Sequence, residues 1–177
     1  MRSSVRLRTG SMMPAGAAPP RRAPVTSGTA VGPLRVGQTG RVLDRNGLEM
    51  LDHDECLRLL AEVRVGRVGI TTEALPVVLP VNFVLDRERV VFSSAPGTKL
   101  YVAATGAQMA FEADDVDPGA RTGWSVCVTG PGTLVDDPAE VDRLRGLPLD
   151  TWAPQGEESF VVIEPQVVTG RRLRGGT

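Results

Sequence analysis

The sequence predicts a mainly β protein with short helices, built as an antiparallel barrel rather than as a doubly wound parallel sheet. Between positions 52 and 173 the patterns indicate roughly six to eight short strands and three short helices. The strands follow one another directly, mostly without the helical crossovers that parallel strands require. The chain has 177 residues, of which 41% are hydrophobic, so it can form one domain with its own core.

The first helix is expected just after Leu51. Asp52 or His53 precedes acidic residues in the first turn, where carboxylates stabilise the positive end of the helix dipole, and apolar residues then recur at helical spacing. A second short helix is expected over residues 99–105. A third is expected over residues 138–147, where a proline stands first and apolar residues follow at intervals of three.

The strands are predicted from apolar runs that are bounded by turn residues. They cover residues 65–72, 77–85, 89–94, 108–112, 124–130 with a continuation at 133–135, 159–164 and 166–173. Turns or loops are expected at residues 75–76, 86–88 and 114–123. Pro80 interrupts the second strand and marks an edge or a bulge, because proline cannot donate to a ladder. Apolar and polar residues alternate from Trp124 to Gly130, so consecutive side chains there should face opposite ways.

The formal net charge of −1 hides an uneven distribution of charge along the chain. Residues 1–40 carry six arginines and no acidic residue, whereas residues 41–177 carry 14 basic and 21 acidic residues. Proline, glycine and alanine dominate the first segment, so we predict a disordered basic tail over residues 1–40 and one folded domain over residues 41–177. The arginines of the tail form no dense cluster, which disfavours nucleic acid as a partner.

Cysteine and histidine content restricts the possible chemistry. Cys56 and Cys127 form no C-x-x-C motif and His53 is the only histidine, so we expect no bound metal. There is no apolar run of about 18 residues and no apolar stretch after Arg21-Arg22, so we expect a reduced, cytoplasmic protein without a membrane span. No P-loop, dinucleotide fingerprint or nucleophile motif is present.

The remaining candidate for chemistry is the segment Ser93-Ser94-Ala95-Pro96-Gly97-Thr98-Lys99. A strand ends in two hydroxyl side chains, a Pro-Gly turn follows, and Thr98 and Lys99 open the second helix. Hydroxyls, amide N–H groups at a helix start and an ammonium group together suit a phosphate. Lys99 is the only lysine among 20 basic residues, and lysine presents a compact point charge that arginine does not. An ordinary capped helix with an exposed lysine fits the local sequence equally well.

Six segments between Leu51 and Leu173 carry a resemblance to a known family. They are ECLRLLAEVRVGRVGI, LPVVLPVNFV, VVFSSAPGTKL, MAFEADD, TGWSVCVTG and VTGRRL. In this order and spacing they resemble the pyridoxamine 5'-phosphate oxidase-like family, and within it the uncharacterised bacterial branch more than the oxidase that makes pyridoxal phosphate. The resemblance implies a six-stranded antiparallel split β-barrel that binds a flavin between the two subunits of a homodimer.

The resemblance also implies roles for particular residues. Ser93, Ser94, Thr98 and Lys99 would hold the phosphate of flavin mononucleotide (FMN). The strand Leu79-Pro80-Val81-Asn82 would lie along the isoalloxazine ring, and Trp124 and Ser125 match a segment that approaches the flavin from the neighbouring subunit. Trp124 is equally well explained as a core residue, because tryptophan usually buries most of its area.

The function implied by the resemblance is that of an FMN-dependent oxidoreductase acting on an unidentified small molecule. No catalytic side chain is assigned, because a flavin supplies the redox chemistry itself. Where the vitamin-making oxidase has an arginine and a lysine on the ring-lining strand, this chain has Val77 or Val78 and Asn82, so oxidation of pyridoxamine phosphate is not implied. Weaker phosphate contacts leave coenzyme F420 or haem as alternatives to FMN. The alternative function is a non-catalytic dimeric protein that stores or senses such a cofactor.

Overall fold

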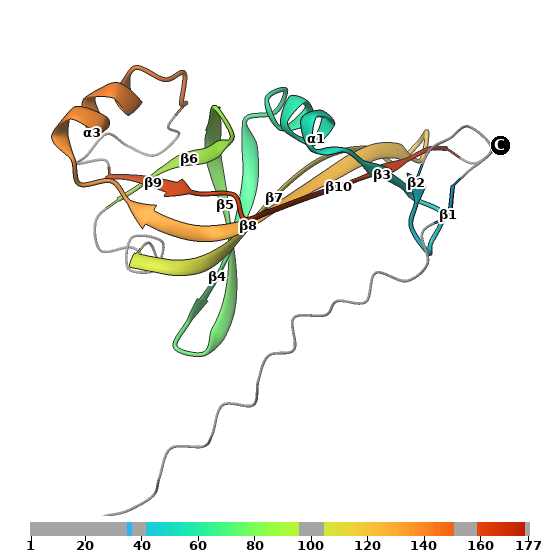
Figure 1. Ribbon diagram of the computed structural model, residues 1–177, viewed down its shortest axis with the longest axis horizontal. Helices are drawn as coiled ribbons and strands as arrows, with labels where there is room; N and C mark the ends of the chain where they lie inside the picture. The colour runs from blue at the N-terminus through green and yellow to red at the C-terminus, as the bar shows by residue number, and fades with distance from the viewer. Residues whose placement is uncertain (1–34, 37–41, 96–104, 151–158, 176–177) are drawn as a thin grey trace, which may run out of the picture. The chain divides into compact units, whose positions relative to one another are not determined.

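The structure, a computed structural model, describes residues 35–36, 42–95, 105–150 and 159–175. Ten strands and two helices lie in these ranges (Figure 1). The strands are β1 (Arg35–Val36), β2 (Val42–Leu43), β3 (Glu49–Leu51), β4 (Val65–Thr72), β5 (Leu75–Asp86), β6 (Arg89–Ser94), β7 (Thr105–Asp117), β8 (Thr122–Leu134), β9 (Ser159–Ile163) and β10 (Val167–Leu173). The helices are α1 (His53–Leu60) and α3 (Pro138–Arg145).

Six of the strands close into an antiparallel barrel. Around the barrel the order is β8, β7, β4, β5, β6 and β9, and the ring closes because residues 132–134 of β8 pair with β9. Residues 123–129 of β8 pair instead with β10, which begins an extension of the sheet through β3 and β2 to β1. One part of β8 therefore closes the barrel with β9, and the other part pairs with β10 in the extension of the same sheet. The mainly β antiparallel barrel that the sequence predicts is confirmed.

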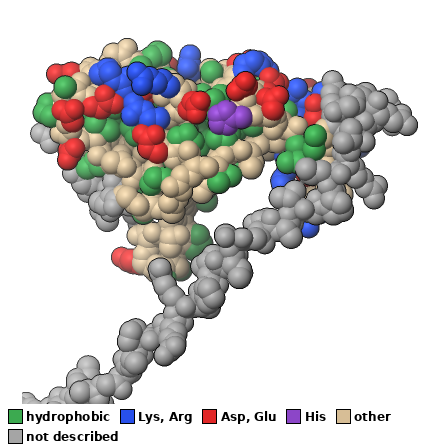
Figure 2. All heavy atoms as spheres, viewed as in Figure 1, with side chains coloured by type: hydrophobic (Ala, Val, Ile, Leu, Met, Phe, Trp, Pro, Cys, Tyr) green, Lys and Arg blue, Asp and Glu red, His purple; other side chains and the backbone are tan. Residues whose placement is uncertain are grey.

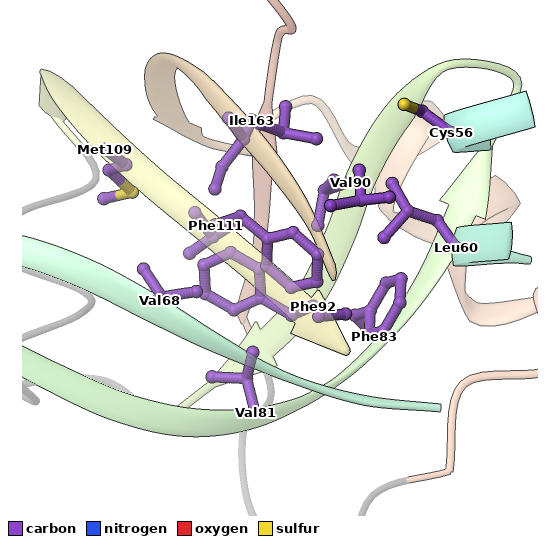
Figure 3. Close-up of a cluster of buried hydrophobic side chains, with 14 of the residues drawn as sticks. Cys56, Leu60, Val68, Val81, Phe83, Val90, Phe92, Met109, Phe111 and Ile163 are labelled. Atoms are coloured by element: carbon purple, nitrogen blue, oxygen red, sulfur yellow. The ribbon is translucent and has the colours of Figure 1, made fainter. Parts of the chain in front are cut away.

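Three phenylalanines lie at the centre of the barrel. Phe83, Phe92 and Phe111 are fully buried, and the rings of Phe83 and Phe111 meet edge to face with centroids 4.6 Å apart (Figure 3). Leu60 of α1 joins the same cluster. Each such side chain stabilises the fold by about 1.5–3 kcal/mol through burial, so this cluster is a major source of the barrel's stability.

A second apolar cluster lies on the outer side of the barrel, beneath α3. It consists of Val84, Val91, Leu144, Phe160 and Val162. Because side chains alternate along a strand, β5, β6 and β9 bury one set of residues inside the barrel and the other set under the helix. This two-sided burial explains the unbroken apolar run in β6.

Both described helices begin as the sequence predicts. The Asp52 side chain accepts a hydrogen bond from the Glu55 amide at 2.8 Å and caps α1. Asp137 caps α3 in the same way, with Pro138 in the first turn. Helix α3 ends at Arg145, before the predicted end at residue 147, with the cap at Gly146. The helix expected over residues 99–105 lies outside the described residues except for Thr105, which begins β7.

The turn expected at residues 75–76 is wrong, because the chain reverses two residues earlier. Glu73 and Ala74 have φ values of 50° and 62°, and pairing of β4 with β5 resumes at once with Thr72 opposite Leu75. Pro80 lies within β5, opposite Arg67 of β4. In the described part of the chain β6 joins β5 only from Phe83 onward, so Pro80 occupies a stretch with a free edge, as proline requires.

The loop expected over residues 114–123 is also wrong. Strand β7 continues to Asp117 and β8 starts at Thr122, so only residues 118–121 form the turn. The Asp117 carboxylate holds this turn by accepting hydrogen bonds from the amides of Gly119 at 2.8 Å and Ala120 at 2.9 Å. The end of β7 is rich in aspartate, and for this reason its sequence resembles that of a polar loop.

Strands β1 to β3 were not predicted. Arg35 and Val36 lie within the segment expected to be disordered, yet they form β1 and pair with β2. The remaining residues of that segment, 1–34 and 37–40, lie outside the described residues. No helix in the described ranges is long and apolar enough to cross a membrane.

Candidate functional site

The candidate site lies where β5 and β6 separate. The hairpin pairs from Asp86 opposite Arg89 to Phe83 opposite Phe92. Beyond that last pair β5 continues beside β4, and β6 continues beside β9. Asn82 and Ser93 each stand one residue beyond it, and Ser94 follows. The backbone positions of a carboxamide residue and two hydroxyl residues therefore lie at the divergence of the strands.

The two serines belong to opposite faces of β6. Ser94 is buried and shares the barrel-facing side with Phe92, whereas Ser93 is half-buried on the other side. The other two residues of the predicted phosphate cradle, Thr98 and Lys99, lie outside the described residues. The structure thus describes the strand half of the cradle only.

The predicted ring-lining strand also divides between two faces. Leu79 and Val81 pack against the barrel core. Pro80 and Asn82 lie on the outer face, where Pro80 is exposed and Asn82 is half-buried. Of these four side chains, Pro80 and Asn82 are therefore the ones placed to meet a ligand on the outer face.

Trp124 and Ser125 are consecutive in β8 and lie on opposite faces of the sheet. Trp124 is 8% exposed and belongs to the main core cluster. It also lines a surface hollow of about 390 Å³ together with Arg172 and Arg174. Ser125 lies on the outer face, paired with Asp114 of β7 and Arg171 of β10. One ligand face therefore cannot receive both side chains from a single subunit.

A row of paired residues crosses the outer face from β5 to β10. Pro80 is opposite Arg67 and Arg67 is opposite Glu112. Glu112 is in turn opposite Cys127, which is opposite Thr169. The Arg67 Nη1 atom lies 2.5 Å from Asp114 Oδ1 and 3.1 Å from Glu112 Oε2. These carboxylates raise the pKa of Arg67 above its ordinary value, so it is charged at any working pH.

An ion pair fixes α1 to the sheet extension. The Arg172 Nη2 atom lies 2.6 Å from Glu55 Oε1. Arg58, followed by Arg172, lowers the pKa of Glu55 to about 2 through hydrogen bonds. At Gly170, next to this pair, a Cβ atom would stand 2.5 Å from Cys56 Sγ, so glycine allows the helix to pack closely on β10. Arg172, which lines the Trp124 hollow, is thus held by an ion pair to α1.

A larger hollow of about 640 Å³ lies elsewhere, between α3 and the β5–β6 turn. Four of its charged lining residues are joined by ion pairs: Arg89, Arg143, Glu140 and Glu164. Arg143 also makes two hydrogen bonds to Asp86, at 3.0 and 2.6 Å. Figure 2 shows acidic and basic side chains intermingled on the surface over α3. Such a neutralised cluster suits the attachment of a helix better than the capture of a charged ligand.

Known proteins of similar sequence and structure identify the family of this barrel. Residues 52–172 match the model of the pyridoxamine 5'-phosphate oxidase family. The chain belongs to this family. The uncharacterized protein Rv0080 of Mycobacterium tuberculosis is 45% identical over 128 residues, which cover 70% of this chain and 84% of that protein. The predicted resemblance to an uncharacterised bacterial branch is therefore confirmed.

Two solved structures show the family's barrel. The FAD binding protein from Mycobacterium smegmatis is 36% identical, with a TM-score of 0.61, and the match covers 71% of this chain and 97% of that one. A candidate pyridoxamine 5'-phosphate oxidase from Corynebacterium glutamicum is 30% identical, with a TM-score of 0.66, and the match covers 73% and 96%. The six-stranded antiparallel barrel of this chain is accordingly the split barrel of the pyridoxamine 5'-phosphate oxidase-like family.

Sequence reasoning missed charged groups that lie near the predicted site residues. Arg67 and Asp114 are 47 positions apart, and only the pairing of β4 with β7 brings them together. Arg174, beside the Trp124 hollow, follows the last predicted strand and carries no motif of its own. Alternation in VGRVGI was a usable signal for Arg67, because it puts that side chain on the polar face of its strand.

Proposed function

We propose that this protein is a flavin-dependent oxidoreductase that acts on a small molecule. FMN would bind where β5 and β6 diverge, with Ser93, Ser94, Thr98 and Lys99 around its phosphate. Pro80 and Asn82 would lie along the ring, and Ser125 would approach from a second subunit. When bound, the flavin supplies hydride or electron transfer. The chain's own residues bind and orient it and keep water from one side of it.

The observation that carries the proposal is the placement of Asn82 and Ser93 one residue beyond the last β5–β6 pair, on the outer face, in a chain of this family. The carboxamide can donate to and accept from the polar edge of a flavin, and the serine hydroxyls can donate to phosphate oxygens. These groups fit the cofactor. Support also comes from the relative that is described as an FAD binding protein and is 36% identical over nearly its whole length.

A homodimer belongs to the same proposal. The outer face that holds Pro80 and Ser125 also carries exposed apolar side chains, with Val78 65% and Val167 55% exposed. Covering such a face with a second copy would bury apolar area that a small domain leaves in water. Light scattering of the full chain should give twice the monomer mass, and a monomer would contradict a site shared between subunits.

The proposal is tested first by colour and titration. The purified protein should be yellow, or should become so when FMN is added, with a flavin absorption band shifted from that of free FMN. Protein that takes up neither FMN, FAD nor F420 would contradict the proposal.

Replacing Lys99 by alanine should weaken FMN binding by about 1–3 kcal/mol, because a charge-assisted hydrogen bond to the phosphate is lost. Fluorescence quenching of FMN measures the affinity. The control is Arg145→Ala on α3, whose side chain is 62% exposed and pairs with Asp142, and which should bind FMN like the wild type. Equal affinities of the two variants would remove Lys99 from the cradle.

The alternative is a protein that stores or senses FMN, F420 or haem without turnover. One observation favours it: Glu112 and Asp114, the carboxylates on β7 two strands away from the ring-lining strand, are both held by Arg67 rather than free to exchange protons. For haem ligated by His53 the position is unfavourable, since His53 Nε2 lies 3.6 Å from Glu88 at the closed end of the β5–β6 hairpin. Bound flavin that no reductant such as a nicotinamide nucleotide can reduce would support storage.

A further inference from the structure

The part of β5 proposed to line the flavin, from Val78 to Asn82, carries no charged side chain on its outer face. Val78, Pro80 and Asn82 are its outward residues, and Pro80 has no backbone N–H to donate. An oxidised flavin that gains two electrons and one proton acquires one negative charge on the pyrimidine part of its ring. Protein charges beside that part decide how strongly the reduced form is held. Within the described part of one subunit, a cation beside this stretch would come from a neighbouring strand.

Arg67 occupies the required place. It is directly opposite Pro80 in the β4–β5 pairing, on the same outer face, and its side chain is 54% exposed. Opposite residues of an antiparallel pair have Cβ atoms about 4.5–5.5 Å apart, so a guanidinium at Arg67 reaches a planar group that lies along Pro80.

The order of the strands determines on which side of Arg67 its carboxylate partners lie. Strand β4 lies between β5 and β7, so Glu112 and Asp114 stand on the side of Arg67 that is away from Pro80. Both carboxylates contact Nη1 only. The Nε and Nη2 atoms make no hydrogen bond within the described part of the chain. A group over β5 therefore meets the positive end of an oriented ion pair.

We propose that Arg67 tunes the redox potential of the bound flavin by stabilising its reduced, anionic form. Asp114 and Glu112 fix the guanidinium and offset part of its charge. The inference rests on the proposed function, because it requires a flavin along β5. Arg67 is assigned a tuning role by position and charge, not a direct part in the chemistry.

The test compares two variants that should act in opposite directions. In the full chain loaded with FMN, Arg67→Gln should make the midpoint potential more negative. A tenfold loss of preference for the reduced flavin corresponds to about 30 mV for this two-electron couple. Asp114→Asn should make the potential less negative, because it removes the charge that offsets Arg67. Spectroelectrochemical titration measures both, with Arg145→Gln as the control that should not shift.

Opposite shifts of the midpoint potential would distinguish tuning by charge from a simple disturbance of the sheet. A disturbance would shift the potentials of both variants in the same direction. The affinity for oxidised FMN should change less than about threefold in either variant, as fluorescence quenching would show. Unshifted potentials, or shifts of the same sign, would overturn the role of Arg67 while leaving the flavin site intact. A chain that binds no flavin would overturn the proposed function and this inference together.

Discussion

Replacing Gly130 by alanine is expected to destabilise the protein by about 3 kcal/mol or more, at the upper end of what overpacking costs. A Cβ atom on Gly130 would stand 1.8 Å from the carbonyl oxygen of Glu164, which is backbone and cannot rotate away. The segment from Glu164 to Gln166 crosses β8 at this point. It is fixed there by hydrogen bonds from the Glu164 amide to Pro131 O at 3.2 Å and from the Gln166 amide to Thr129 O at 2.9 Å. The substitution therefore disrupts the backbone where β8 changes its pairing partner from β10 to β9.

Chemical denaturation of the variant and of a matched control measures this effect. Gly69→Ala is the control, since its Cβ would lie 3.6 Å from Ala110, an ordinary contact, in the same barrel. Its free energy of unfolding should stay within about 1 kcal/mol of the wild type, because alanine also lowers the entropy of the unfolded chain. Similar stabilities of the two variants would show that the crossing has room for a side chain.

The barrel strands were predictable where burial is one-sided or continuous. Strand β4 was predicted at its observed bounds, and the alternation from Trp124 to Gly130 assigned the faces of β8 correctly. The β5–β6 hairpin follows from its short polar turn at Arg87 and Glu88. A two-residue connection fixes the register, so the placement of Asn82 and Ser93 just beyond the last pair of the hairpin was implicit in the sequence.

The sheet extension was not predictable, for physical reasons. Strands β1 to β3 are two or three residues long, too short to show a period. The outer part of the β7–β8 hairpin carries aspartates on an exposed strand, and a loop has the same composition. Asp114 is acceptable in a strand because Arg67 neutralises it, and that partner is known only once β4 lies beside β7.

The sequence indicated which residues belong to the candidate site, but less well on which strand faces their side chains lie. The hydroxyl-rich segment and the family motifs pointed to Asn82 and Ser93, which lie just beyond the last β5–β6 pair, and to Ser94 on the other face of β6, and their role in binding stays a prediction. The motif treated Trp124 and Ser125 as a unit, although strand alternation separates them. Charges from other strands, such as Arg67, are fixed by pairing of distant segments and carry no local signal.

Replacing Asp86 by asparagine is expected to cost about 3 kcal/mol and to loosen α3 from the barrel. The Asp86 carboxylate is 8% exposed and lies between Arg143 and Arg89, at the turn that joins β5 to β6. Removing one member of such a cluster leaves the opposite charges poorly compensated, which costs more than the loss of a surface pair. Because Arg143 and Arg89 extend to Glu140 of α3, the change also weakens the cover over Val84 and Phe160.

In the wild type, the contribution of this cluster to the free energy of unfolding should decrease in acid. Hydrogen bonds from Arg143, against the opposing effect of burial, hold the pKa of Asp86 well below its usual range, and Arg143 and Arg89 lower that of Glu140 to about 2. A carboxyl whose pKa is depressed by folding stabilises the protein fully above its unfolded pKa, near 4, and loses that contribution as the pH falls through the folded pKa. The free energy of unfolding of the wild type should therefore fall between about pH 4 and pH 2, and that of Asp86→Asn should fall less over the same range.

The control, Asp142→Asn, removes a 75% exposed partner of Arg145 from the same helix and should change stability by no more than about 0.5 kcal/mol. If Asp86→Asn matched this control at neutral pH, or kept the acid dependence of the wild type, the attachment of α3 would have to come from its apolar face alone.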